Sequence, residues 1–104
     1  QSGNKKAFAR AQALYLQNNG TGGTLTIDED GICERNEAGV ETRFDWEDYR
    51  CCVMSREVIV VVFYKPVMLI FSRTRETEDG LAEALLAVEK EKTIYEVEVK
   101  EKRK

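Results

Sequence analysis

The chain has 104 residues, 16 Lys and Arg against 19 Asp and Glu, a formal net charge of −3 and no His. Its length suits one compact domain, and a composition that is 42% hydrophobic and 34% charged is typical of a folded globular domain rather than a disordered segment. Without His, no Ser-His-Asp or Cys-His catalytic site and no Cys2His2 zinc site can form. We therefore predict a module that is not an enzyme and that binds no cofactor or metal.

The ends of the chain suggest a fragment of a longer protein. It begins with Gln1, and its two methionines, Met54 and Met68, are internal. The longest apolar run, residues 58–64, is far shorter than the roughly 20 residues that span a bilayer. We expect any membrane-spanning part of the parent protein to lie outside this chain.

Residues 4–18 have the periodicity of an amphipathic helix. Its apolar positions are Phe8, Ala11, Leu14 and Tyr15. Asn and Gly residues over 18–23 then end the pattern, because both tolerate the left-handed backbone conformations of helix ends and loops. Residues 1–23 are therefore predicted to form an N-terminal helix and a Gly-rich linker.

After the linker the apolar period changes to two, which predicts short strands joined by turns. The first strand carries Leu25 and Ile27 on one side. An acidic turn over residues 28–31 follows, and residues 32–36 return as a second strand.

The third strand is expected over residues 40–46, where apolar and charged residues alternate. One side of it carries Val40, Thr42, Phe44 and Trp46. This alternation is typical of an antiparallel strand with one buried face. Glu47 and Asp48 interrupt the pattern, and residues 49–54 resume it as a fourth strand.

The run over residues 58–64 is rich in β-branched residues and too apolar for an edge strand. Lys65 and Pro66 end it, because Pro cannot donate a hydrogen bond to a central ladder. Residues 67–71 then close the meander. We predict that the strands over 40–46 and 58–64 are adjacent in one antiparallel sheet.

A C-terminal helix is predicted over residues 77–91. Thr77 followed by acidic residues is typical of a helix start. Leu81, Leu85 and Val88 form an apolar stripe that we expect to pack on the sheet.

Past this helix, Tyr95, Val97 and Val99 alternate with charged residues. Residues 93–104 are predicted to be an extra strand, paired within the chain or in a dimer, or a charged tail. Together the elements predict an α+β fold, with an antiparallel β-meander or partly open barrel of about six strands, a C-terminal capping helix and an N-terminal helix.

Four segments carry a family resemblance: residues 25–32, residues 44–49 with their Trp-Glu-Asp step, the apolar strands around Lys65, and the basic residues 72–75. Through them, residues 24 to about 88 resemble the soluble domain of the YcxB-like family of small bacterial membrane proteins. The resemblance implies a pleckstrin-homology (PH)-like barrel with its C-terminal helix over residues 24–92, which follows two transmembrane helices and has no established chemistry.

The resemblance also implies a function: a non-catalytic cytoplasmic interaction or regulatory domain, soluble itself and held at the cytoplasmic face of the bacterial inner membrane. Its expected partners are the missing transmembrane segment of its own protein or other proteins, with weak or no direct lipid binding and no nucleic acid. A homodimer is left open. The alternative is a small-ligand-binding or thiol-dependent enzymatic α+β domain.

Four residues are candidates for a basic surface patch that binds phosphate head groups or nucleic acid: Arg50, Lys65, Arg73 and Arg75. The net charge of −3 and the acidic first turn oppose this interpretation. We favour the interpretation that these four residues are ordinary solvent-exposed residues at strand ends and in a loop beside the helix.

Residues 26–37 approximate a calcium-binding loop, but Thr26 replaces its usual first Asp and the flanks resemble strands rather than helices, so a β-turn is favoured. Residues 20–23 are rich in Gly but lack the Lys of a phosphate-binding loop, which favours a linker.

Trp46 is either a ligand platform or a core anchor, and its phase with the apolar side of its strand favours the core. Cys51 and Cys52 have no His to act as a base and are favoured as small buried hydrophobes on opposite faces of a strand. With Cys33 they make an odd count, and we predict three reduced thiols.

Overall fold

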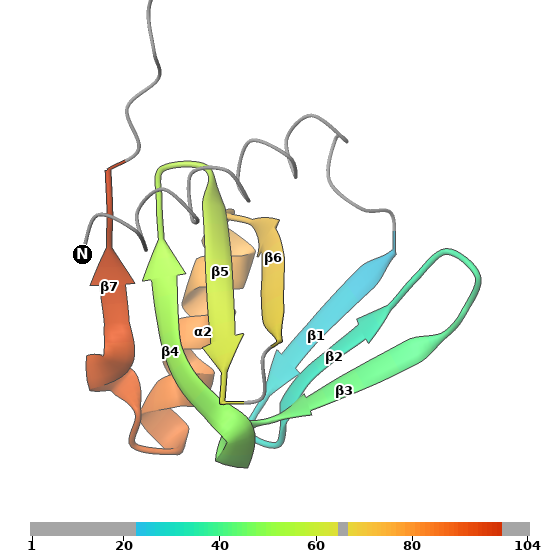
Figure 1. Cartoon of the computed structure of the whole chain (residues 1–104), viewed down its shortest axis with the longest axis horizontal. Helices are drawn as coiled ribbons and strands as arrows, with labels where there is room; N and C mark the ends of the chain where they lie inside the picture. The colour runs from blue at the N-terminus through green and yellow to red at the C-terminus, as the bar shows by residue number, and fades with distance from the viewer. Residues whose placement is uncertain (1–22, 65–66, 99–104) are drawn as a thin grey trace, which may run out of the picture.

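Short β-strands joined by tight turns make up most of the computed structural model, which describes residues 23–64 and 67–98 (Figure 1). Its elements are β1 (Thr24–Asp28), β2 (Gly31–Arg35), β3 (Glu41–Asp45), the 3₁₀ turn η1 (Trp46–Asp48), β4 (Tyr49–Met54), β5 (Val58–Phe63), β6 (Met68–Ser72), α2 (Arg75–Ala87), the 3₁₀ turn η2 (Glu91–Thr93) and β7 (Ile94–Glu96). The predicted α+β class is confirmed. The N-terminal helix and linker predicted over 1–23 lie, except for Gly23, outside the described residues.

β1, β2 and β3 form an antiparallel sheet in that order. The first turn is stabilised by the Asp28 carboxylate, whose Oδ1 accepts hydrogen bonds from the backbone N–H groups of Asp30 and Gly31 at 2.9 and 3.2 Å. Gly31 has a φ of 151°, and a Cβ at this position would collide with the carbonyl oxygen of Phe44. Glycine is therefore required where β2 starts beside the end of β3.

The second sheet has the order β6-β5-β4-β7. β5 is antiparallel to both β4 and β6, so it is an internal strand, as its β-branched run predicts. β7 pairs with β4 in the parallel direction. The sheet therefore departs from a purely antiparallel meander at its last strand.

The core lies between the two sheets and α2, which is behind the four-stranded sheet in Figure 1. Its largest fully buried members include Ile32, Ile59, Val61, Leu81 and Leu85. The side chain of Phe44 from β3 stacks on that of Phe63 from β5, with 5.1 Å between the ring centroids. This contact joins the two sheets through side chains rather than backbone hydrogen bonds.

The prediction that the strands over 40–46 and 58–64 are adjacent in one sheet is wrong, because β3 and β5 belong to different sheets. The chain turns between them at η1, where the Asp45 carboxylate accepts a hydrogen bond from the backbone N–H of Glu47 at 3.1 Å. In the described part of the chain the two sheets do not close into a barrel.

The predicted apolar stripe over 40–46 is buried only at its second half. Val40 is 58% exposed and Thr42 is exposed, whereas Phe44 packs against the core and Trp46 is 3% exposed. The outer half of the β2–β3 hairpin extends beyond the core (Figure 1). Apolar and charged residues alternate there as predicted, but the side chains have no core to pack against and stay exposed.

α2 begins and ends earlier than the predicted 77–91. Thr74, not Thr77, is the N-cap: its hydroxyl accepts a hydrogen bond from the Thr77 N–H at 3.1 Å, and the Thr77 hydroxyl accepts one from the Thr74 N–H at 2.8 Å. Such a reciprocal pair satisfies two helix-start donors at once. Glu89 has a φ of 62°, a conformation that stops the helix soon after Ala87.

Within residues 93–104, Ile94–Glu96 form the strand β7, which pairs with β4 of the same chain. Ile94 packs against the core, while Tyr95, on the other side of the strand, is 56% exposed. The preceding turn η2 sets this phase, since the Tyr49 hydroxyl and the Thr93 hydroxyl lie 2.7 Å apart and hold the start of β7 against β4.

We expect Trp46→Ala to lower the free energy of unfolding by about 3–5 kcal/mol, because it removes a buried ring and leaves a cavity. Trp46→Phe is the matched control. It keeps most of the ring and loses the hydrogen bond from Trp46 Nε1 to the Asp28 carbonyl oxygen, which should cost about 1–2 kcal/mol. Urea denaturation measures both, and an unchanged midpoint for Trp46→Ala would contradict its place in the core.

Candidate functional site

An open groove of about 600 Å³ lies at the end of the molecule where the β1–β2 turn, η1 and the segment after α2 meet. Its rim carries four carboxylates, from Glu29, Asp30, Asp45 and Glu47. Phe44, Trp46 and Val88 also line the groove and are more buried than these four acids, so we call them its apolar floor. The groove therefore combines an acidic rim with an apolar base.

Trp46 holds the three segments of the groove together. Its indole Nε1 donates a hydrogen bond of 2.7 Å to the carbonyl oxygen of Asp28, which positions the β1–β2 turn. Its own carbonyl oxygen accepts a hydrogen bond of 2.9 Å from Lys90 Nζ, which positions the segment after α2. The prediction that Trp46 lies in the core is confirmed, because its side chain is 3% exposed and packs edge-on against Tyr49.

The charge of the groove is negative. Two cationic residues line it, Arg43 and Lys90, against the four carboxylates. Lys90 already donates to the Trp46 carbonyl oxygen and lies 5.9 Å from the centre of the Tyr49 ring. A ligand with positive charge and an apolar side chain is the chemical complement of this surface.

Burial raises the pKa values of three side chains on β4 of the four-stranded sheet: Tyr49, Cys51 and Cys52. Burial raises the pKa of the Cys52 thiol to about 12, and it also raises the pKa of the half-buried Cys51 thiol, which Arg50 partly opposes. Burial likewise raises the pKa of the Tyr49 hydroxyl above its ordinary value. All three groups are protonated at neutral pH, so neither thiol has the thiolate character of a nucleophile.

Cys33, Cys51 and Cys52 are free thiols in the structure. Cys52 is fully buried and Cys51 is half-buried, on opposite faces of β4 as their adjacent positions predict.

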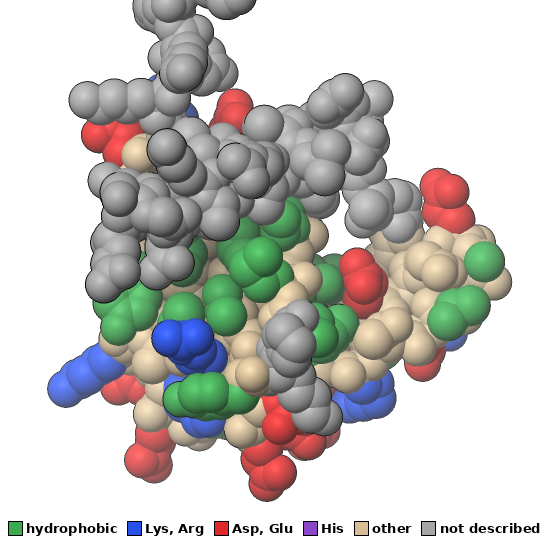
Figure 2. Space-filling view, in the orientation of Figure 1, with side chains coloured by type: hydrophobic (Ala, Val, Ile, Leu, Met, Phe, Trp, Pro, Cys, Tyr) green, Lys and Arg blue, Asp and Glu red, His purple; other side chains and the backbone are tan. Residues whose placement is uncertain are grey.

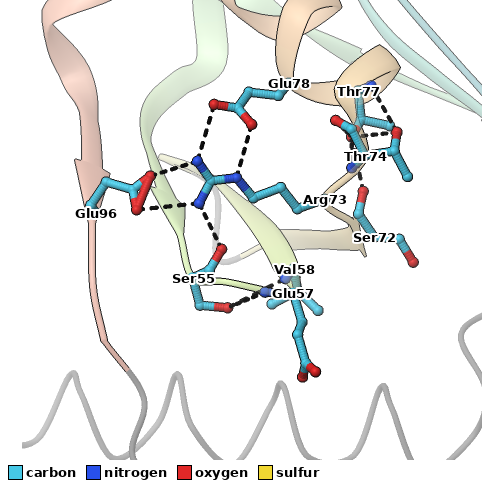
Figure 3. A network of polar contacts seen from close by, with 9 residues as sticks. All are labelled: Ser55, Glu57, Val58, Ser72, Arg73, Thr74, Thr77, Glu78 and Glu96. Carbon is cyan, nitrogen blue, oxygen red and sulfur yellow. Dashed lines mark hydrogen bonds and ion pairs between the residues drawn. The ribbon is translucent and has the colours of Figure 1, made fainter.

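Arg73, one of the predicted patch residues, is a structural clamp (Figure 3). Its Nε and Nη2 donate to the two carboxylate oxygens of Glu78, both at 3.0 Å, in a bidentate pair. Its Nη1 donates to the Ser55 carbonyl oxygen at 2.8 Å, and Nη2 lies 2.8 Å from Glu96 Oε1. The guanidinium thus joins the end of β4, the start of α2 and β7.

Two of the other predicted patch residues, Arg50 and Arg75, lie on different elements. Arg50 is exposed near the start of β4, whereas Arg73 contacts Ser55 just beyond the end of that strand. Arg75 is exposed as the first residue of α2. Lys65 lies outside the described residues, so the four-residue patch stays a prediction.

The acidic turn over residues 28–31 has the ordinary geometry of a β-turn, in which Asp28 Oδ1 is occupied by two backbone N–H groups. Within residues 23–64 and 67–98, no three His, Cys, Asp or Glu side chains are grouped so that they could hold a metal ion. Of the glycine-rich segment 20–23, all but Gly23 lies outside the described residues.

Sequence reasoning did not find the groove. It singled out the turn over 28–31 and Trp46 separately, but it gave no role to Val88 or Lys90 as neighbours of either. The pairing depends on a hydrogen bond between residues 44 positions apart, which no local pattern encodes. A run of acids around a single Trp, at Asp45, Glu47 and Asp48, was the available signal.

No family model, curated protein or solved structure matches the chain. No helix in the described ranges is long and apolar enough to cross a membrane.

The Arg73–Glu78 pair should make stability depend on pH. The Arg73 guanidinium holds the pKa of Glu78 below its usual 4.5, so the pair stabilises the fold above this pH and the stabilisation is lost as the pH falls through the lowered pKa. Because Glu78 is partly exposed and solvent screens the pair, Glu78→Gln should cost only about 0.5–1 kcal/mol at pH 7 and less near pH 3.

Urea denaturation at both pH values measures the difference, with Glu76→Gln as the control. Glu76 is exposed in the same helical turn, so this variant removes the same charge without touching the clamp. Equal pH dependence of the two variants would contradict a stabilising role for the Arg73–Glu78 pair.

Proposed function

We propose that this chain is a non-catalytic protein-interaction domain that binds a basic segment with an apolar anchor in the groove at η1. The observation that carries the proposal is the acidic rim of Glu29, Asp30, Asp45 and Glu47 around an apolar floor. Opposite charge speeds encounter and fixes orientation, while an apolar side chain supplies affinity by leaving water.

A PH-like architecture is part of this proposal. The resemblance to YcxB-like domains implies it, and two sheets packed around one core with a helix after the last antiparallel strand support it. The same resemblance supports a place at the cytoplasmic face of the bacterial inner membrane, as the regulatory part of a small membrane protein. Its partner there is a segment of its own protein or of another protein.

The thiol-dependent enzyme is the weaker alternative. Both thiols on β4 have raised pKa values, and Cys52 has no exposed surface. A nucleophilic thiol requires a lowered pKa and access to substrate. No residue of β4, and therefore neither of these thiols, is among the residues that line the groove.

We expect the chain to remain in the supernatant when it is centrifuged with phosphatidylserine-containing liposomes at near-physiological salt. The net charge of −3 opposes adsorption, and each surface Lys or Arg contributes only about 1 kcal/mol of attraction. Liposomes of neutral phosphatidylcholine are the control. Strong binding to the anionic vesicles that added salt reverses would make lipid head groups, rather than a protein segment, the ligand.

Selection of a random displayed peptide library on the folded chain should yield peptides that combine Lys or Arg with a large apolar residue. A selected peptide, titrated by fluorescence anisotropy, should bind Asp30→Lys at least about tenfold more weakly. The Asp30 side chain is exposed and its turn contact uses its backbone N–H, so this variant keeps the fold.

Glu37→Lys is the matched control, because it makes the same charge change in the exposed turn between β2 and β3, away from the groove. Its affinity should stay within about twofold of the parent chain. Equal weakening in both variants would show that net charge, and not the groove, attracts the peptide.

A further inference from the structure

β3 is an edge strand. The three-stranded sheet has the order β1-β2-β3, so among the described residues β3 pairs with β2 alone. We call the side of β3 that points away from β2 its outer edge. All residues of the strand except Phe44 are exposed, and Figure 2 shows the β2–β3 hairpin projecting from the rest of the molecule. Such an edge presents a row of backbone N–H and C=O groups that can pair with another chain.

The hairpin determines which backbone groups of β3 point toward β2. The Asn36 N–H donates a hydrogen bond of 3.0 Å to the Val40 carbonyl oxygen, which closes the hairpin. Hydrogen-bonded and non-hydrogen-bonded pairs alternate along an antiparallel ladder, so Thr42 and Phe44 direct their N–H and C=O groups at β2. The position of the Phe44 carbonyl oxygen, where a Cβ on Gly31 of β2 would collide with it, agrees with this phase.

Glu41 and Arg43 belong to the alternate set. Their backbone N–H and C=O groups therefore point to the outer edge. Across residues 23–64 and 67–98, no other strand pairs with these groups. The outer edge thus offers donors and acceptors at every second residue, in the spacing that an added strand requires.

The groove at η1 meets β3 at one end of this edge. Three consecutive residues of the strand, Arg43, Phe44 and Asp45, line the groove. Side chains of consecutive strand residues point to opposite sides of a sheet, so a surface that reaches all three passes around the strand. Because β2 occupies the other edge, a ligand in the groove can continue along the outer edge.

The side chains of β3 favour a particular partner sequence. Arg43 and Asp45 lie on one side of the strand, and Thr42 lies on the other with Val40, which is 58% exposed just before the strand begins. Opposite charges stabilise a cross-strand pair and like charges destabilise it. The edge therefore favours Lys or Arg opposite Asp45, an acidic or neutral residue opposite Arg43, and an apolar residue beside Val40.

We propose that the basic segment bound in the groove continues as an extended strand that adds to the outer edge of β3. This inference rests on the proposed function, because the groove supplies the anchor and β3 supplies the backbone partners. Main-chain hydrogen bonds then contribute affinity, while alternate side chains select the sequence. A second copy of the chain is the poorer occupant, since its net charge of −3 opposes the acidic rim of the groove.

N-methylation of each amide in turn, in a peptide selected from the random library, tests the added strand. In a strand, alternate N–H groups face the neighbour, and methylation of these should weaken binding at least about tenfold. Methylation of the intervening amides should leave the affinity within about twofold, because those N–H groups face solvent. Fluorescence anisotropy measures each Kd.

The outcomes separate this inference from the proposed function. If binding of the peptide still weakens with Asp30→Lys but shows no period of two in the N-methyl series, the added strand is overturned and the groove remains the site. If the selection yields no peptide, the proposed function fails and this inference fails with it.

Arg43→Pro and Arg43→Ala test the same bond from the side of the protein. Both variants remove the Arg side chain, but only Pro removes the outward N–H, which β2 does not use. The selected peptide should bind Arg43→Pro at least about tenfold more weakly than Arg43→Ala. Urea denaturation of both variants checks the fold, and equal affinities in two folded variants contradict the added strand.

Hydrogen exchange on the unmodified chain, resolved by residue with NMR, does not depend on the folding of a variant. Saturating peptide should slow exchange of the Arg43 amide at least about tenfold, while the Thr42 amide, already paired with β2, is the internal control. An unchanged Arg43 rate with peptide bound overturns the proposal. Slow exchange of this amide without peptide, lost on dilution, overturns it in favour of a second copy at the edge.

Discussion

Burial of Trp46 at the corner between the two sheets is the constraint on which the rest of the structure depends. The indole fills the core beside Tyr49, and its Nε1 must find an acceptor because an unpaired N–H there would be costly. The Asp28 carbonyl oxygen meets this need and fixes the first turn against the corner. With Trp46 turned inward, the adjacent Asp45 and Glu47 side chains are exposed. The acidic rim of the groove is thus a consequence of how the core is closed.

Arg73 plays the equivalent part at the other end of the four-stranded sheet. Its guanidinium contacts carboxylates on α2 and β7 and the carbonyl oxygen of Ser55, so three segments distant in sequence share one cation. The planar fork of Arg suits this task, whereas the point charge of Lys cannot make the bidentate pair with Glu78. A residue that satisfies so many internal acceptors has little capacity left for a phosphate ligand.

Local pattern predicted the strands well and their partners poorly. Period-two alternation identifies the faces of a strand, and the β-branched run of β5 correctly predicted an internal position. Alternation does not specify the neighbouring strand, so the separation of β3 from β5 at η1 could not be predicted from it. The predicted helix started at Thr77, whereas the N-cap of α2 is Thr74, because both residues are good caps. The choice between them depends on a reciprocal pair of hydrogen bonds that joins the two residues.

The candidate site was predicted only in pieces for a related reason. Trp46 and the acidic turn were visible as separate signals, but Val88 and Lys90 join them through packing that follows α2. The contacts of Arg73 were not predicted, because Glu96, one of its partners, is 23 residues away on a strand whose pairing was itself left open. A contact between residues this far apart in the chain closes a long loop at a cost in entropy. The pattern of a short stretch of sequence does not show which of these contacts form.

The groove and the side of the four-stranded sheet that points away from α2 are physically independent surfaces of one domain. The groove is lined by the β1–β2 turn, β3, η1 and the segment after α2, whereas that side of the sheet belongs to β4, β5 and β6. They share no lining residue, and effects at sites that are well separated and share no partners usually add. A change of charge at the groove should therefore leave the packing of the four-stranded sheet unchanged. The four-stranded sheet thus keeps apolar side chains on both of its sides, while the acidic residues Glu29, Asp30, Asp45 and Glu47 gather at the groove.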